Sequence, residues 1–286
     1  MRRQQWRPVC IGQRLRSLQT LCQNLDIHMN LQREKATVAK GSTRREWYGF
    51  ATDEWILNDR ACFLVRPNIP AQSQPWIWRT EFFGHEPQAD IALLERGFHL
   101  AYIDVQDMYG APVAMRHMRA FYQQLTREYS LSARVALEGF SRGGLFALNW
   151  AIAYPDKVAC LYLDAPVCDF RSWPAGMRAG TGSPDDWEKC KAVYGLTQQQ
   201  AIEYANGPLD NLQPLAQAKI PILCVCGAAD TVVQMKENTN ILEERYRALG
   251  GPIKVLVKPA CEHHPHSLQD PTPIVEFVMA NTVNTR

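Results

Sequence analysis

Residues 135–144 read VALEGFSRGG, and this stretch decides the fold expected for the rest of the chain. An apolar strand-like run ends here in the pattern G-x-S-x-G, and the helix-like run Leu145–Tyr154 follows at once. A turn this tight forces a strained backbone on Ser141 and lifts its hydroxyl above the end of the strand. A Cβ atom at Gly139 or Gly143 is expected to collide with neighbouring backbone. The pattern and its context predict a nucleophilic serine.

Strand-like and helix-like runs alternate on both sides of this motif. The expected strands are Trp47–Leu57, Cys62–Pro67, Pro75–Thr80, His99–Val105, Arg134–Glu138, Ala159–Val167, Pro221–Gly227 and Ile253–Lys258. The expected helices are Ala89–Arg96, Val113–Glu128, Leu145–Tyr154, Gln234–Leu249 and Pro273–Asn281. Such alternation predicts an α/β fold, with a mostly parallel eight-stranded sheet and helices on both of its faces.

One long segment interrupts the alternation. Residues 168–219 carry loop signals and two short helical stretches, and about fifty residues is too long for an ordinary connection between a strand and a helix. We therefore expect this segment to be an inserted helical cap.

Charge divides the chain into two regions. Residues 1–46 carry ten Lys/Arg and three Asp/Glu, whereas the remainder is mildly acidic, which argues against a nucleic-acid-binding groove. We expect residues 1–46 to be a basic, partly disordered leader without a secretion signal, and residues 47–286 to be the folded domain. The apolar runs are far shorter than a membrane span requires, so we expect none.

The nine cysteines contain no C-x-x-C pair, which makes zinc-ribbon or thioredoxin-like chemistry unattractive. Free, buried cysteines in the reducing cytoplasm are the simpler interpretation. We expect no cofactor.

A serine nucleophile needs a base, and three of the seven histidines lie together in residues 261–266, CEHHPH. His263 is favoured because it follows the last expected strand most closely; His266 is the alternative, and His264 is expected to stabilise the loop. Metal ligation would need Cys or carboxylate partners at helical or hairpin spacing, which the local sequence does not provide. No metal site is expected here.

The imidazole in turn needs a carboxylate on its far nitrogen. Asp230 follows the expected strand Pro221–Gly227, and the chain order Ser141, Asp230, His263 is the one that successive strand ends deliver. The alternative role of Asp230 is that of a helix N-cap. Asp164 and Asp104 also lie near strand ends and remain competing acids.

From about residue 47 onward the sequence resembles the α/β-hydrolase family, in particular its single-domain prolyl-oligopeptidase-like and dienelactone-hydrolase-like branches. The resemblance is most specific at Gly139–Gly144, Pro221–Val233 and Lys258–Leu268. It implies a Ser141–His263–Asp230 triad. The family usually carries His-Gly after the third strand, whereas this chain reads RTEFF at residues 79–83.

The expected activity is hydrolysis of small or carbohydrate-linked carboxylic esters through an acyl-enzyme intermediate, with a small-molecule ester as the partner. The alternatives are a peptidase or amidase of prolyl-oligopeptidase type, and a binding protein that keeps the fold without catalysis. The oxyanion hole is expected from the main-chain N–H of Arg142 and a second donor at Glu81 or Thr80.

Four further side chains have two interpretations each. The Arg142 side chain either pairs with a nearby acid or binds an anionic substrate, and Glu81 either pairs with Arg79 or lines the pocket. In both cases the structural role is preferred. The strand tryptophans Trp76 and Trp78 are expected to pack in the core. Trp173 and Trp187, in the expected cap, are instead candidates for substrate contact, stacking on a sugar ring or covering an acyl chain.

Overall fold

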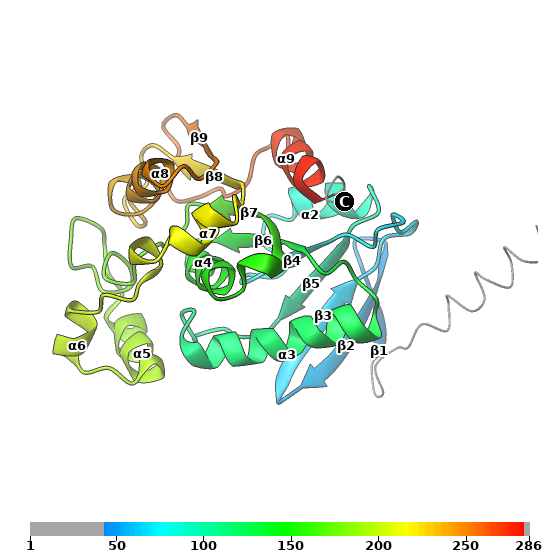
Figure 1. Ribbon diagram of the computed structural model, residues 1–286, viewed down its shortest axis with the longest axis horizontal. Coiled ribbons are helices and arrows are strands. Elements are labelled where there is room, and N and C mark those ends of the chain that lie inside the picture. Colours follow the sequence, from blue (N-terminus) through cyan, green and yellow to red (C-terminus); the bar gives the residue numbers. More distant parts are fainter. Residues whose placement is uncertain (1–42, 283–286) are drawn as a thin grey trace, which may run out of the picture. The chain divides into compact units, whose positions relative to one another are not determined.

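The computed structural model describes residues 43–282, and within them one nine-stranded sheet has the order β1-β2-β3-β5-β4-β6-β7-β8-β9 (Figure 1). The strands are β1 Thr43–Trp47, β2 Phe50–Leu57, β3 Arg60–Val65, β4 Trp76–Arg79, β5 His99–Ile103, β6 Val135–Phe140, β7 Val158–Asp164, β8 Ile222–Gly227 and β9 Ile253–Lys258. The helices are α2 Gln88–Leu94, α3 Pro112–Glu128, α4 Gly143–Ala153, α5 Pro184–Tyr194, α6 Gln198–Ile202, α7 Gln213–Gln217, α8 Thr239–Ala248 and α9 Thr272–Thr282.

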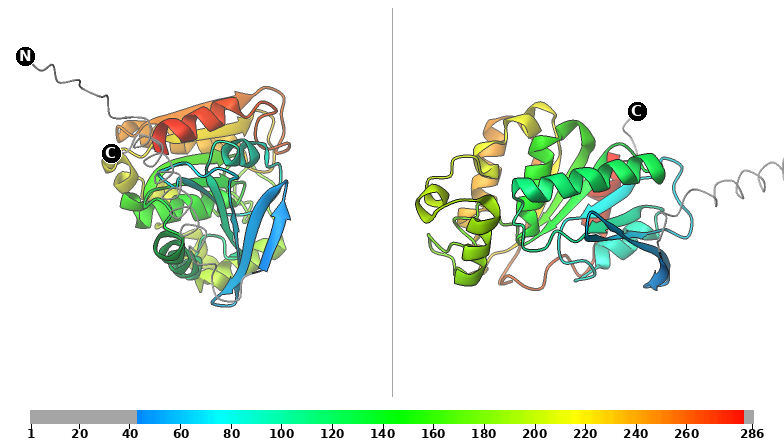
Figure 2. Two further views of the ribbon diagram at one scale, coloured as in Figure 1. Left: turned by 90° about the vertical axis from the view of Figure 1, so that its right-hand side faces the viewer. Right: turned by 90° about the horizontal axis from the view of Figure 1, so that it is seen from below.

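The sheet is antiparallel at one end and parallel elsewhere. Two hairpins join β1 to β2 and β2 to β3, and β3 pairs antiparallel with β5; every other pair is parallel. Both hairpin turns have two residues with positive φ, Tyr48–Gly49 and Asn58–Asp59, as tight two-residue hairpins require. The β1–β2 hairpin forms one edge of the sheet (Figure 2).

The expected α/β architecture is therefore present, but the described residues form nine strands rather than eight. The run Trp47–Leu57 was expected as one strand, and the Tyr48–Gly49 turn divides it. The extra strand β1 begins at Thr43, inside the segment assigned to the basic leader. Residues 1–42 lie outside the described residues.

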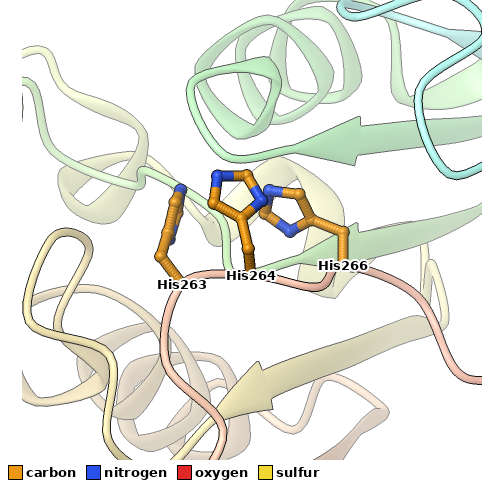
Figure 3. A group of neighbouring side chains, drawn as sticks. All are labelled: His263, His264 and His266. Atoms are coloured by element: carbon orange, nitrogen blue, oxygen red, sulfur yellow. The ribbon is translucent and has the colours of Figure 1, made fainter.

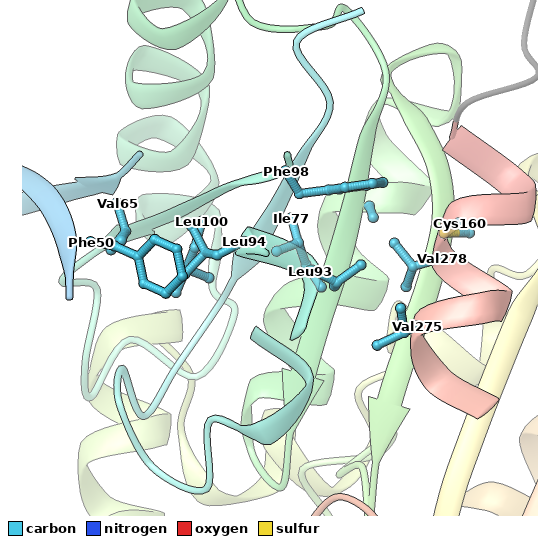
Figure 4. Close-up of a cluster of buried hydrophobic side chains, with 11 residues drawn as sticks. Phe50, Val65, Ile77, Leu93, Leu94, Phe98, Leu100, Cys160, Val275 and Val278 are labelled. Atoms are coloured by element: carbon cyan, nitrogen blue, oxygen red, sulfur yellow. The ribbon is translucent and has the colours of Figure 1, made fainter. Parts of the chain in front are cut away.

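Helices cover both faces of the sheet. On one face α2 and α9 lie side by side and pack on an apolar cluster that includes Ile77, Leu100 and Ala136 (Figure 4). On the other face α3 and α4 cover Trp76 and Trp78, which stack on each other with ring centroids 5.6 Å apart. This covering on both faces explains why β4 to β8 are apolar almost throughout.

The segment between β7 and β8 contains α5, α6 and α7. Its apolar side chains pack with Tyr109 and Leu145 in a separate cluster. The helix expected over Gln234–Leu249 is interrupted at Asn238, whose side chain is buried. Asn238 accepts a hydrogen bond from the Cys168 N–H and donates one to Ser172 Oγ, so contacts with the β7–β8 segment override the local helical pattern.

Among residues 43–282 no helix is both long and apolar enough to span a membrane. The seven cysteines of this part of the chain are all free thiols, and six of them are buried.

Candidate active site

Ser141 occupies the turn between β6 and α4 with φ +49°, a left-handed conformation that non-glycine residues rarely adopt. Its N–H donates to the Asp164 carbonyl at 2.9 Å, and its carbonyl accepts from Val167 N at 2.8 Å. A Cβ atom on Gly139 would lie 2.9 Å from the Gly143 carbonyl oxygen, so the expected backbone collision is present there. At Gly143 the expectation is wrong, because the nearest atom would be Thr80 Oγ1 at 3.1 Å rather than backbone.

The structure brings Ser141, His263 and Asp230 together from three separate loops. His263 Nε2 lies 3.0 Å from Ser141 Oγ, and His263 Nδ1 lies 2.7 Å from Asp230 Oδ2. The other Asp230 oxygen, Oδ1, accepts the N–H groups of Val232 and Val233 at 2.8 Å each. Asp230 therefore has both interpreted roles, as a partner of the imidazole and as an acceptor for the backbone that follows.

Gly227 allows the loops carrying Asp230 and His263 to meet. A Cβ atom on this last residue of β8 would lie only 2.2 Å from the Glu262 carbonyl oxygen and 2.3 Å from that of Cys261. The Ala229 N–H donates to the same Cys261 carbonyl at 2.9 Å. The histidine loop thus crosses directly over the end of β8, where only glycine leaves room.

His266, the alternative base, has its own carboxylate. His266 Nδ1 lies 2.9 Å from Asp164 Oδ1, and both side chains are buried. Asp164 Oδ2 accepts the N–H of Ser267 and the hydroxyl of Tyr162. Two of the competing candidates therefore form a second Asp–His pair beside the first. Asp104 instead accepts the Gln106 N–H at 3.1 Å.

A pocket of about 430 Å³ lies over the Ser141 hydroxyl. Its lining combines two aromatic side chains with four histidines: Phe82, Phe83, His85, Ser141, His263, His264 and His266. Figure 3 shows three of the imidazoles rising from one loop toward the same side. Its volume falls within the range of small-molecule sites.

The two tryptophans expected to contact substrate do not line this pocket. Trp187 is only 7% exposed, donates from Nε1 to Gln198 Oε1 and packs on Phe170, so it belongs to an apolar core. Trp173 is partly buried against the same cluster, with its ring 6.4 Å from that of Tyr109. The pattern of the sequence did not distinguish core tryptophans from pocket tryptophans in this segment.

Arg142 anchors the start of α4 through its side chain. Its Nε lies 2.5 Å from Glu81 Oε2, and its Nη1 donates to Asp107 Oδ1 at 3.0 Å. Burial raises the pKa of Glu81 to about 7, against the lowering effect of the Arg142 guanidinium. The preferred structural interpretation of Arg142 agrees with these contacts. Glu81 pairs with Arg142, and not with Arg79 as expected.

A second charged cluster, missed by the sequence analysis, lies beneath the Ser141 turn. Arg79 at the end of β4 pairs with Asp90 of α2, and Glu138 of β6 lies 3.5 Å from the same guanidinium. Arg79 and Glu138 are each 1% exposed. Burial raises the pKa of Glu138 well above its usual range, which favours its protonated form. The sequence could have indicated this cluster, because WIWR and VALEGF each contain one charged residue, Arg79 and Glu138, in an otherwise apolar strand.

The mostly parallel sheet, its helices on both faces and the serine between a strand and a helix define an α/β-hydrolase fold. Residues 70–190 match the family model described as alpha/beta hydrolase fold.

Solved structures share the fold. Puromycin hydrolase is 18% identical, with a TM-score of 0.61 over 84% of this chain. The dipeptidyl peptidase 4 of Porphyromonas gingivalis is 16% identical, with a TM-score of 0.60 over 85%. The acylaminoacyl peptidase of Pyrococcus horikoshii is 12% identical, with a TM-score of 0.62 over 87%. This chain spans 38%, 35% and 43% of those three chains respectively.

Proposed function

We propose that this protein is a serine hydrolase that transfers an acyl group first to Ser141 and then to water. The observation that carries the proposal is the continuous chain of contacts from Ser141 Oγ to His263 Nε2, at 3.0 Å, and from His263 Nδ1 to Asp230 Oδ2, at 2.7 Å. Both distances allow proton transfer along the path that nucleophilic catalysis needs.

In the first half-reaction, Ser141 Oγ attacks the substrate carbonyl carbon while His263 Nε2 takes the hydroxyl proton. The tetrahedral intermediate expels the leaving group, which receives that proton from His263, and an ester on Ser141 remains. His263 then takes a proton from water as the water oxygen attacks this ester. The second tetrahedral intermediate releases the acid when its bond to Ser141 Oγ breaks and His263 returns the proton to that oxygen. Asp230 holds the Nδ1–H tautomer and stabilises the imidazolium in both halves.

The oxyanion needs two donors, and we assign them to the main-chain N–H groups of Arg142 and Glu81. Neither group has a hydrogen-bond partner among residues 43–282, and Arg142 is also at the N-terminus of α4. Thr80, the other candidate, is excluded because its N–H donates to the Glu138 carbonyl at 2.9 Å.

Esters are the first substrate class that we propose, small or carbohydrate-linked. Amides and peptides are the second, since similar structures include a dipeptidyl peptidase and an acylaminoacyl peptidase. These similarities support the prolyl-oligopeptidase-like branch of the family. An amide requires protonation of its leaving nitrogen by His263, whereas an activated ester does not, so the two classes test different steps.

The experiment is fluorophosphonate labelling of the full chain, with Ser141→Ala as the matched variant. We expect one covalent adduct on Ser141 and none on the variant. Rates on p-nitrophenyl esters and on amino-acyl p-nitroanilides of matched acyl group then separate the two substrate classes. A folded chain that forms no adduct and cleaves neither class would instead support the binding-protein alternative.

The free thiols favour a reducing compartment, and we propose the cytoplasm.

A further inference from the structure

Three histidines of the loop between β9 and α9 form a compact group. One ring nitrogen each from His263, His264 and His266 lies within 4.8 Å of the other two. The ring centroids are 4.7 to 5.0 Å apart, and Figure 3 shows the rings adjacent on one side of the loop. Zn–N bonds are about 2.0–2.1 Å long, so the three rings must turn toward one another to bind one ion.

Two of these histidines are held by buried carboxylates. Asp230 lies 2.7 Å from Nδ1 of His263, and Asp164 lies 2.9 Å from Nδ1 of His266. Histidines that bind metals almost always donate their second ring N–H to a carboxylate or carbonyl, which fixes the tautomer and makes the free nitrogen more basic. In both pairs the nitrogen left for a ligand is Nε2.

The loop itself is held in place from several sides. Lys258 Nζ donates to the Ser267 carbonyl at 3.1 Å, and the Ser267 N–H donates to Asp164 Oδ2 at 2.8 Å. Glu86 Oε2 accepts the N–H of His266. A loop fixed in this way pre-organises its ligands, which lowers the cost of ordering them around an ion.

From these observations we infer that His263, His264 and His266 bind a divalent transition metal with zinc-like preferences. Three imidazoles with a fourth, open position are a donor set that suits Zn²⁺. A second group, His85, Glu86 and His264, also has its ligand atoms within 4.8 Å. This second group is more exposed, and its Glu86 already accepts the His266 N–H, so it is the weaker site.

Occupancy of this site takes His263 Nε2 away from Ser141, so the ion inhibits the hydrolase. This consequence, unlike the binding itself, rests on the proposed function. The inference also reverses the expectation from sequence that the histidine loop holds no metal. Of the supporting carboxylates, Asp164 ends β7 and Asp230 lies in the loop after β8. Both are far from the histidine loop in the sequence, so local spacing did not reveal them.

Binding is tested on the intact, chelator-treated chain by equilibrium dialysis against Zn²⁺ and by the visible spectrum of bound Co²⁺. We expect one ion per chain and a tetrahedral Co²⁺ spectrum. Loss of a supporting carboxylate alone costs about 10–100-fold in metal affinity, and His264→Ala, which removes a ligand, should cost more. His117→Ala, on α3 outside the pocket, is the matched control and should bind as the unmodified chain does.

Three results would overturn the site: no bound ion, equal binding by His264→Ala, or loss of binding in His85→Ala. Fluorophosphonate labelling with and without Zn²⁺ tests the inhibition separately, and we expect the ion to slow labelling and a chelator to restore it. If the zinc-loaded chain is labelled at an unchanged rate, the inference that the ion takes His263 away from Ser141 is refuted. If the metal-free chain does not react with the fluorophosphonate, the proposed hydrolase activity is contradicted instead. The metal site is then still tested by equilibrium dialysis.

Discussion

Replacing Asp230 by Asn is the most informative change to the proposed triad, because the structure fixes how the new amide must be oriented. Asp230 Oδ1 accepts two N–H groups, from Val232 and Val233, both at 2.8 Å. An Asn at this position must keep its oxygen there, so its NH₂ group faces His263 Nδ1. The imidazole then has to accept at Nδ1 and carry its proton on Nε2.

That tautomer presents an N–H to Ser141 Oγ, where the reaction needs an acceptor. In a serine triad this single change costs about 10⁴-fold in kcat, or about 5.5 kcal/mol at 1.36 kcal/mol for each factor of ten. The two backbone hydrogen bonds survive, so the free energy of unfolding should change by less than about 1 kcal/mol. The assay combines initial rates on a p-nitrophenyl ester with a denaturant titration of the same sample.

Asp156→Asn is the matched control, since Asp156 is exposed and its ion pair among residues 43–282 is with its neighbour Lys157. It should leave kcat unchanged. The reasoning is refuted if folded Asp230→Asn keeps more than about a tenth of the activity, given the 10⁴-fold loss expected of a wrong tautomer. Equal losses in the two variants would refute it as well.

Three further changes test other parts of the structure. Ser141→Ala should lower kcat by about 10⁶-fold with the melting temperature retained, and residual turnover near that of the unmodified chain would contradict its role as nucleophile. Trp187→Ala should destabilise the fold by about 3–5 kcal/mol, and a raised KM with unchanged stability would instead restore its role in substrate contact. Glu81→Gln tests the pH dependence of stability. Burial raises the pKa of Glu81 to about 7 in the folded state, from the ordinary value of 4.5, so the folded state holds the proton more tightly than the unfolded state. The free energy of unfolding therefore falls as the pH rises from about 4.5 to 7. The Gln variant should lose that slope in urea titrations at several pH values, and an unchanged slope would assign it to other groups.

The Ser141, Asp230 and His263 assignments could be made from the sequence because each depends on a local pattern. In a parallel sheet, the loop after each strand begins at the same carboxyl edge. Polar residues that follow three such strands are therefore brought to one place. The structure brings these three side chains into contact, as that argument requires. The catalytic role of these three residues is the part that remains a proposal.

The roles of Asp164, His266 and Trp187 depended on long-range packing, which local patterns do not contain. Asp164 and His266 were alternative candidates for the acid and the base of one triad. In the structure they contact each other, although they are 102 positions apart in the sequence. For Trp187, packing in the cluster that contains Phe170 shows that the side chain belongs to a core. Likewise, the antiparallel edge strand β1 was not predicted, because the basic composition around it indicated a partly disordered leader.

Asp164 explains why two Asp–His pairs lie side by side at this site. Its carbonyl accepts the Ser141 N–H, while its carboxylate holds His266 Nδ1 and the Ser267 N–H. A strained backbone such as that of Ser141 persists only where its surroundings determine it fully. The end of β7 therefore fixes the position of the nucleophile and that of the histidine loop through one residue. The pair Asp164–His266 sets the geometry in which His263, and not His266, reaches the serine.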